Sequence, residues 1–375
     1  MSAEVQKLGM PKWGLSMTEG RVVAWLVEEG ADISVGEEVA EVETEKLNGA
    51  VESPVAGVLR RRVADEGDVV AVGGLLGVIA DAAVPDADVD AFIADFQASF
   101  VPGETEEDAG PQPETVTVEA GTLRFLRHGE GGEPLVLLHG FGGDLNNWLF
   151  NIEPLAAERA VYAVDLPGHG ASVKQVGDGD LGVLVDAVRA FLDSQGIERA
   201  HLAGHSLGAL VASELALAEP GRVLSLSLIS PAGLGEEIDR AYVEGFVAAT
   251  GRRDLKPVLQ RLFADADLVN RQMVDDVLKY KRLDGVQDAL RTLASRLFPE
   301  GRQARVLAGE LEGYPGPILV IWGERDAIIP AAQAQAAPGR AHTHVLPGVG
   351  HSPHMEAAGE VNRLMEGFLT GLRAG

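Results

Sequence analysis

Apolar and polar residues alternate in short runs along the first eighty residues, and glycines separate these runs. The pattern repeats after 37 positions, so that Gly20 corresponds to Gly57 (57 − 20 = 37). Further matched pairs are Gly30 and Gly67, Gly36 and Gly73, Val22 and Leu59, Ile33 and Val70, Val39 and Leu76, and Val42 and Ile79. Alternation with a period of two is typical of strands. Two equal halves of short strands predict an all-β flattened barrel with pseudo-twofold symmetry over residues 1–80.

The composition changes to Ala, Asp, Glu, Pro and Gly over residues 81–114. Residues 103–113 are acidic and rich in Gly and Pro, which is typical of an extended linker. Before them, an apolar stripe predicts one short helix over residues 89–100. The stripe consists of Val89, Phe92, Ile93, Phe96 and Phe100, at spacings of three and four. We consider two places where this helix docks: a partner subunit, or one of the chain's own domains.

Strand and helix patterns alternate over residues 115–375, which predicts a mainly parallel sheet with helices on both faces. The expected strands are 115–118, 123–127, 135–138, 161–164, 200–203, 224–229, 318–322 and 343–346. Residues 231–304 form a helical insertion between two of these strands, at the place where such folds carry a lid. The expected fold is therefore multidomain, with a β-barrel followed by an α/β domain.

The segment from Gly204 to Gly208 reads Gly-His-Ser-Leu-Gly and joins a strand to a helix. Glycines on both sides of a serine permit the tight turn that exposes a serine nucleophile above the sheet. The turn makes Ser206 the candidate nucleophile. It also places the Leu207 N–H at the positive end of the following helix, where it can bind a developing oxyanion.

Three more loops follow strands and supply the groups that an activated serine requires. The Phe141 N–H lies in a His-Gly-Phe-Gly-Gly loop and can complete the oxyanion hole with Leu207. Asp326 and His351 then follow in the chain order of an α/β-hydrolase triad, because a base must take the serine proton and an acid must orient that base. Glu324 and His354 are the weaker alternatives for acid and base. His139 and the loop at residues 165–170 are expected to be structural.

The composition of the chain excludes several kinds of partner and site. The chain has 31 Lys and Arg against 57 Asp and Glu, a net charge of −26, which opposes binding to nucleic acid or to an anionic membrane. Cysteine is absent, so disulfides, thiolate metal sites and cysteine nucleophiles are excluded, and we expect no metal site. No signal peptide or membrane-spanning run is recognisable, so we expect a cytoplasmic protein.

Lys46 lies at the seam between the two β repeats, at the expected tip of a hairpin. Its surroundings read Glu-Thr-Glu-Lys-Leu-Asn over residues 43–48, followed by Glu-Ser-Pro-Val-Ala-Gly over residues 52–57. Together with the repeat and the Met-Pro-Lys-Trp-Gly-Leu opening at residues 10–15, this resembles a lipoyl domain, which implies covalent lipoate on Lys46. The family's more usual turn is Asp-Lys-Ala, and the Met-Lys-Met turn of biotin carriers is absent. An ordinary solvated turn lysine is the alternative.

The combination of units resembles the acetyltransferase subunits of acetoin-cleaving (acetoin dehydrogenase) complexes, in which a lipoyl domain precedes an α/β-hydrolase domain. The His-x-x-x-Asp-Gly pattern of ordinary dihydrolipoyl acyltransferases does not occur. The resemblance implies acetyl transfer from a dihydrolipoyl thioester to coenzyme A. It also implies a thiamine-diphosphate-dependent enzyme and a dihydrolipoamide dehydrogenase as partners, and a homo-oligomer.

Other functions than acetyl transfer are also open. The chain could instead be a serine hydrolase of a small ester, thioester or carbon–carbon bond, with the lipoyl domain as carrier or tether. For acetyl transfer, the route is also open: either Ser206 forms an acyl-enzyme, or His351 activates the thiol directly. An inactive scaffold is a third possibility, which the intact triad argues against.

Basic residues are dense in the lid of this acidic chain: Arg252, Arg253, Lys256, Lys279, Lys281 and Arg282. A local positive patch could receive the phosphates of coenzyme A. The alternative is a solvated helix face without a ligand.

Overall fold

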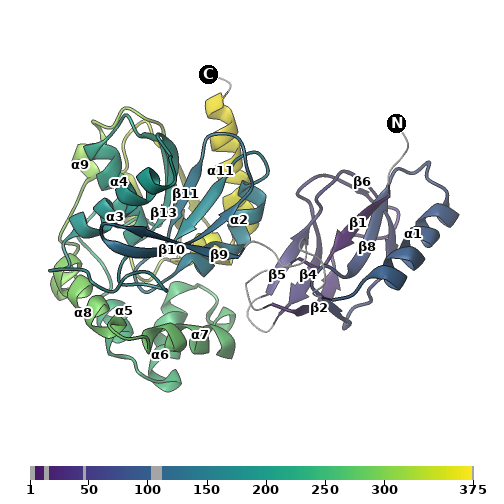
Figure 1. The fold of residues 1–375 in the computed structure, drawn as a ribbon, viewed down its shortest axis with the longest axis horizontal. Coiled ribbons are helices and arrows are strands. Elements are labelled where there is room, and N and C mark those ends of the chain that lie inside the picture. Colours follow the sequence, from purple (N-terminus) through teal and green to yellow (C-terminus); the bar gives the residue numbers. More distant parts are fainter. Residues whose placement is uncertain (1–4, 12–16, 45–47, 103–111, 374–375) are drawn as a thin grey trace. The chain divides into compact units, whose positions relative to one another are not determined.

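The structure is a computed structural model that describes residues 5–11, 17–44, 48–102 and 112–373. It divides into two compact units, Met1–Gln112 and Pro113–Gly375. Each is described by itself (Figure 1).

Two four-stranded sheets build the first unit, with strand orders β1-β8-β6-β3 and β5-β4-β2-β7. The strands are β1 (Gln6–Gly9), β2 (Glu19–Trp25), β3 (Asp32–Ile33), β4 (Glu38–Glu43), β5 (Asn48–Glu52), β6 (Gly57–Arg62), β7 (Val69–Ala71) and β8 (Leu75–Ala80). All their pairings are antiparallel. The second sheet order follows from the first when each strand is exchanged for its counterpart in the other half of the chain, so the predicted pseudo-twofold barrel is confirmed.

The internal repeat extends to individual side-chain contacts. Val22 and its counterpart Leu59 are both fully buried. A Cβ on Gly20 would lie 2.7 Å from a Val42 methyl group, and one on Gly57 would lie 2.8 Å from the equivalent methyl group of Ile79. Both glycines therefore leave room for the same core position, once in each half.

The predicted helix of the linker is α1 (Asp86–Ser99), and it packs on the first unit. Val89 is buried with Val78 and Val84, and Phe92, Ile93 and Phe96 pack against the same cluster. Arg60 of β6 forms an ion pair with Asp86 at 2.7 Å. Of the two docking places considered for this stripe, the chain's own domain is the one occupied. The last strand of this unit, β8, ends at Ala80, and α1 follows it within the same compact unit.

An eight-stranded sheet forms the centre of the second unit, in the order β16-β15-β14-β13-β11-β12-β10-β9. The strands are β9 (Pro113–Val118), β10 (Gly121–His128), β11 (Leu135–Leu138), β12 (Val161–Val164), β13 (Ala200–His205), β14 (Val223–Ile229), β15 (Ile318–Gly323) and β16 (His342–Leu346). From β12 to β16 every neighbouring pair is parallel, and β10 and β9 extend the sheet antiparallel. Each of the eight strands expected from the sequence is present.

Helices cover both faces of this sheet, with α3 and α4 on one face and α2 and α11 on the other (Figure 1). Their bounds are α2 (Leu149–Leu155), α3 (Leu181–Ser194), α4 (Leu207–Ala218), α9 (Ala308–Leu311), α10 (Pro353–Glu356) and α11 (Ala358–Arg373). Four helices, α5 (Arg240–Ala248), α6 (Arg252–Leu259), α7 (Arg271–Lys281) and α8 (Val286–Leu297), gather as a lid beyond the ends of the strands. Two short 3-10 turns, η2 (Gln260–Leu262) and η3 (Ala266–Leu268), lie between α6 and α7, and a third, η4 (Pro299–Gly301), follows α8. No helix in the described ranges is long and apolar enough to cross a membrane.

Candidate active site

Strand β13 ends at His205 and α4 begins at Leu207, so Ser206 occupies the turn between them. Its backbone has φ 50° and ψ −114°, a conformation that is costly for a non-glycine residue and persists where the surroundings enforce it. Both flanking glycines are required: a Cβ on Gly204 would lie 2.4 Å from the Ala209 nitrogen, and one on Gly208 would lie 2.1 Å from the Leu138 carbonyl oxygen. The strained turn predicted for a nucleophile elbow is therefore present, and Ser206 is only 5% exposed.

The loop that follows β11 passes directly against this turn. A Cβ on Gly140 would lie 3.2 Å from the Ser206 Cβ. Within the described part of the chain, the N–H groups of Phe141 and Leu207 have no protein acceptor. Two unengaged peptide donors close to a serine can stabilise an oxyanion.

His139 orients the peptide that carries the Phe141 donor. The His139 Nε2 accepts the Leu166 N–H at 2.9 Å, so the proton resides on Nδ1, which donates to the Gly140 carbonyl at 2.8 Å. Burial lowers the pKa of His139, which keeps the ring neutral. Because the Gly140 carbonyl and the Phe141 N–H belong to one planar peptide, this bond sets the direction of the donor. His139 thus has the structural role expected for it.

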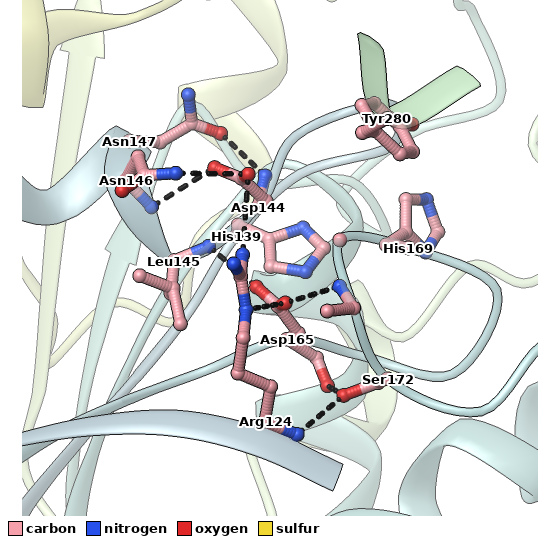
Figure 2. A network of polar contacts seen from close by, with 12 residues as sticks. Arg124, His139, Asp144, Leu145, Asn146, Asn147, Asp165, His169, Ser172 and Tyr280 are labelled. Atoms are coloured by element: carbon pink, nitrogen blue, oxygen red, sulfur yellow. Dashed lines mark hydrogen bonds and ion pairs between the residues drawn. The ribbon is translucent and has the colours of Figure 1, made fainter. Parts of the chain in front are cut away.

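A polar network holds the loop that follows β11 (Figure 2). The buried carboxylate of Asp165 accepts the Leu145 N–H at 2.8 Å and the Arg124 Nε–H at 2.6 Å. Arg124 also reaches Asp144 at 3.4 Å, and Asp144 accepts the Asn146 N–H at 2.9 Å. Burial and the charge of Asp165 raise the pKa of Asp144 to about 6. These contacts fix the loop after the oxyanion peptide.

His351 and Asp326 are joined by a hydrogen bond of 2.8 Å between Nδ1 and Oδ2, with both side chains buried. Asp326 also accepts the Ile328 and Ile329 N–H groups at 2.8 and 2.9 Å and the Trp322 Nε1–H at 3.0 Å. Four donors around one carboxylate hold it in place. The alternative acid Glu324 is exposed and accepts only the Gly348 N–H in the described chain.

Two further histidines lie beside His351, and their roles did not follow from the sequence. The His205 Nε2–H donates to the His351 carbonyl at 2.8 Å and so ties the histidine loop to the nucleophile turn. In the sequence, the signal for this role was the position of His205 next to Ser206 in the elbow. The His354 ring lies between those of His205 and Trp148, tilted against both, with ring centroids 4.5 and 4.6 Å away. Burial lowers the pKa of His354 to about 3, so the ring is neutral and has no contact with Asp326 to act as the base.

The lid bases do not form one free patch. Lys281 is only 2% exposed, donates to the Phe246 carbonyl and lies over the Phe246 ring at 4.5 Å. It is therefore removed from the predicted phosphate contacts, because its ammonium is already bound inside the lid. Arg252 is paired with the Asp275 carboxylate at 2.8 Å. The remaining four, Arg253, Lys256, Lys279 and Arg282, are exposed.

Lys46 lies outside the described residues. The strands on either side of it, β4 and β5, pair antiparallel with Glu43 opposite Asn48. A hairpin therefore begins and ends where the resemblance to lipoyl domains requires one. Among the residues that the structure describes, no group of three or more His, Asp or Glu residues could hold a metal ion.

Comparisons with known proteins agree with both units. The Alpha/beta hydrolase family matches residues 135–364, and the Biotin-requiring enzyme family matches residues 6–79. The second unit resembles a meta-cleavage product hydrolase from Pseudomonas fluorescens, with a TM-score of 0.62 and 24% identity over 69% of this chain and 97% of that one. That likeness bears on the fold alone.

Two relatives align along almost the whole chain. A protein of Pseudomonas putida named "Dihydrolipoyllysine-residue acetyltransferase component of acetoin cleaving system" is 51% identical, covering 98% of this chain and 99% of its own length. A protein of the same name from Cupriavidus necator is 48% identical, covering 99% of each chain. The chain therefore belongs to the family of dihydrolipoyllysine-residue acetyltransferase components of acetoin-cleaving systems.

Proposed function

We propose that this enzyme transfers an acetyl group from a thioester on its lipoyl arm to coenzyme A, with Ser206 as nucleophile, His351 as base and Asp326 as orienting acid. The observation that carries the proposal is that Ser206 and His351, whose loops are joined through His205, are only 5% and 1% exposed, on the same chain as a lipoyl-type unit. A serine triad otherwise delivers acyl groups to water, so exclusion of water favours a thiol acceptor.

In the first half-reaction, His351 Nε2 takes the Ser206 proton as Oγ attacks the thioester carbonyl. The N–H groups of Phe141 and Leu207 stabilise the oxyanion that forms. The carbon–sulfur bond then breaks, His351 returns the proton to the departing sulfur, and Ser206 carries the acetyl ester. Asp326 holds the Nδ1–H of His351 throughout and stabilises the imidazolium.

The second half-reaction runs the same steps in reverse with a new thiol. His351 takes the proton of the coenzyme A thiol, whose sulfur attacks the acetyl ester. When the intermediate collapses, the Ser206 oxygen leaves and recovers the proton from His351. The shorter route, in which His351 activates the thiol for direct attack on the arm's thioester, needs no acyl-enzyme and is separated by the test below.

Lipoate, when bound, supplies the reactive thiol and delivers the acetyl group at high local concentration. Lys46, which lies between β4 and β5 in the sequence, would hold it through an amide. The exposed bases Arg253, Lys256, Lys279 and Arg282 are proposed as contacts for the phosphates of coenzyme A. A thiamine-diphosphate-dependent enzyme would load the arm and a dihydrolipoamide dehydrogenase would reoxidise it. The homo-oligomeric state and the cytoplasmic location stay predictions.

The test supplies the purified lipoylated protein with acetyl-CoA and free dihydrolipoamide, and measures acetyl transfer against acetate release. We expect transfer to dominate. Ser206→Ala and His351→Ala should each reduce it about a thousandfold or more, and the double variant should be little worse, because the residues act as one unit.

Ser213→Ala is the matched control, since Ser213 is buried on the same helix α4 and should leave the rate unchanged. Substantial activity in Ser206→Ala would favour direct activation of the thiol by His351. Acetate as the main product at saturating thiol would replace the transferase by a hydrolase.

A further inference from the structure

Two tyrosines of the lid bind the backbone of the oxyanion loop. The Tyr242 hydroxyl of α5 donates to the Phe141 carbonyl at 3.1 Å, and the Tyr280 hydroxyl of α7 donates to the Gly142 carbonyl at 3.3 Å. Both tyrosines are buried, and burial raises the pKa of each hydroxyl, so both remain protonated donors at neutral pH. The lid thus contacts the two peptides that follow the Phe141 N–H.

The same loop is seated against α5 by close packing. Gly142 has φ +82°, and a Cβ there would lie 2.6 Å from the Phe246 ring. The Phe141 and Phe246 rings meet edge to face at 5.9 Å. The loop backbone therefore has no room to shift toward the lid, and the two hydroxyl bonds oppose a shift away from it.

The lid also holds the histidine loop, through Glu356. This carboxylate accepts the Gly350 N–H, one residue before His351, at 2.6 Å. It also accepts the N–H groups of Ala264 and Asp265, which belong to the lid, at 2.9 and 3.0 Å. The Ser352 N–H, one residue after His351, donates to the lid carbonyl of Leu262 at 3.0 Å. His351 is thus bracketed by two contacts to one lid segment.

From these contacts we propose that the lid is a fixed bridge that positions the oxyanion loop and the histidine loop relative to each other. Tyr242, Tyr280 and Glu356 are its positioning residues. The inference rests on the proposed function, because it matters only if the Phe141 N–H and His351 act on the acyl group. The lid then serves the chemical step as well as covering the site.

A physical argument connects these contacts to the rate. The donors of an oxyanion hole work only when they point at the place where charge develops, and small misplacements of catalytic groups cost large factors. His139 fixes the peptide that contains the Phe141 N–H, and Tyr242 fixes the next one. Removing a hydroxyl from the lid should therefore lower kcat and leave KM unchanged.

The first experiment compares Tyr242→Phe, Tyr280→Phe and their double variant with Tyr314→Phe. Tyr314 is the matched control, because its buried hydroxyl also donates to a backbone carbonyl, that of Val223, at 2.9 Å. Val223 is the first residue of β14, whereas the site lies beyond the last residues of the strands. Losing the hydroxyl should lower the thermal midpoint similarly in all three single variants.

For Tyr242→Phe and Tyr280→Phe, we expect kcat of acetyl transfer to fall about tenfold with KM unchanged. The rate at which a fluorophosphonate labels Ser206 should fall by a similar factor, since this reaction also needs the oxyanion hole. Tyr314→Phe should retain both rates. Equal kcat and labelling rates in all three variants would overturn the inference.

The second experiment compares Glu356→Gln with Glu312→Gln. Glu312 is matched because its carboxylate also accepts a glycine N–H, that of Gly339, at 3.1 Å, just before the start of β16. Glu356→Gln should lower kcat at unchanged KM, and Glu356→Ala should lower it further, because glutamine keeps one acceptor oxygen. If Glu356→Gln behaves like Glu312→Gln, the histidine side of the bridge is refuted.

Failure of the site assignment would look different. If fluorophosphonate does not label the wild-type enzyme, or if Ser206→Ala and His351→Ala keep full activity, the proposed function falls and this inference with it. If labelling and the serine dependence are intact while the lid variants are indistinguishable from their controls, only the bridge is overturned.

Discussion

The two units of the chain differ in what they bury. All nine histidines of the sequence lie in the second unit, from His128 onward, and the first unit has none. Four of them, His139, His169, His205 and His354, are buried there with lowered pKa values caused mainly by burial. The described core of the first unit consists instead of Val, Leu, Ile, Ala and Met side chains, repeated in two halves, with Ser53 as its one buried polar residue.

This difference follows from the two tasks. A carrier unit needs a stable scaffold that presents one lysine, and two copies of an apolar strand pattern are sufficient for that. A catalytic unit must hold polar groups in a dry place, although burying each one costs free energy unless it is hydrogen-bonded. The hydrogen bonds described above offset this cost at His139 and His205, whereas neither ring nitrogen of His354 has a partner among the described residues.

The largest expected effect comes from a substitution in the first unit that leaves the catalytic site of the second unit unchanged. Lys46→Ala should remove the single lipoyl adduct seen by intact mass and abolish transfer from the arm, while transfer from free dihydrolipoamide at saturating concentration should persist. The reason is that tethering contributes an effective concentration on the order of millimolar without altering the catalytic site. Lys7→Ala, at the exposed position next to Gln6 on β1, serves as the control. An adduct on another lysine would refute the assignment.

Next, acid should destabilise the second unit more than the first. Since the folded pKa of His354 is near 3 and lies below the unfolded value of 6.5, the unfolded chain binds the proton more readily between these values. Stability that is present above about pH 6.5 is therefore lost as the pH falls, by about 1.4 kcal/mol per pH unit for each such histidine.

Hydrogen exchange on the full chain can measure this slope in both units between pH 7 and pH 5. His354→Phe should reduce the slope in β13 and β14 by about one proton and leave β2 and β4 unaffected. Neither ring nitrogen of His354 has a partner among the described residues, so the substitution sacrifices no hydrogen bond. An unchanged slope would show that His354 does not carry the effect.

A smaller effect concerns the exposed lid bases. Neutralising Arg253, Lys256, Lys279 and Arg282 together should raise the KM for coenzyme A on the order of tenfold and weaken its salt dependence, since exposed charges contribute little individually. Hydrolysis of a small uncharged ester should not change. Arg291→Gln on α8, which removes an exposed cation already paired with Asp288, is the control. Unaltered use of coenzyme A would reject the patch.

The smallest effect tests the symmetry of the first unit. Gly30 and its repeat partner Gly67 have φ values of +86° and +96°, and a Cβ at either would meet nothing within 4 Å. Gly30→Ala and Gly67→Ala should therefore destabilise the unit equally, by about 1 kcal/mol each, through backbone strain alone. Gly221→Ala, where the added Cβ also meets open space but φ is not left-handed, should cost less in its own unit. Unequal costs at the repeat pair would mean that the halves are not mechanically equivalent.

Local patterns in the sequence determined the elements of this protein. Period-two alternation and matched glycines specify the repeat, because side chains on a strand alternate between its faces. Apolar strands between helical segments specify the parallel sheet. The Gly-His-Ser-Leu-Gly turn specifies the elbow, because only glycine fits at positions 204 and 208. These features depend on residues close together in the chain, so the sequence alone was enough to find them.

Tertiary structure decided which distant side chains meet. The stripe at α1 was visible in the sequence, but only packing showed that it covers its own domain. Lys281 and Arg253 are both basic residues of the lid in the sequence. Lys281 is bound inside the lid, whereas Arg253 is exposed. Tyr242 and Glu356 give no local signal of their contacts with loops about 100 and 90 residues away in the chain. Such contacts depend on how the lid packs on the strand ends, and that packing is a property of the folded chain as a whole.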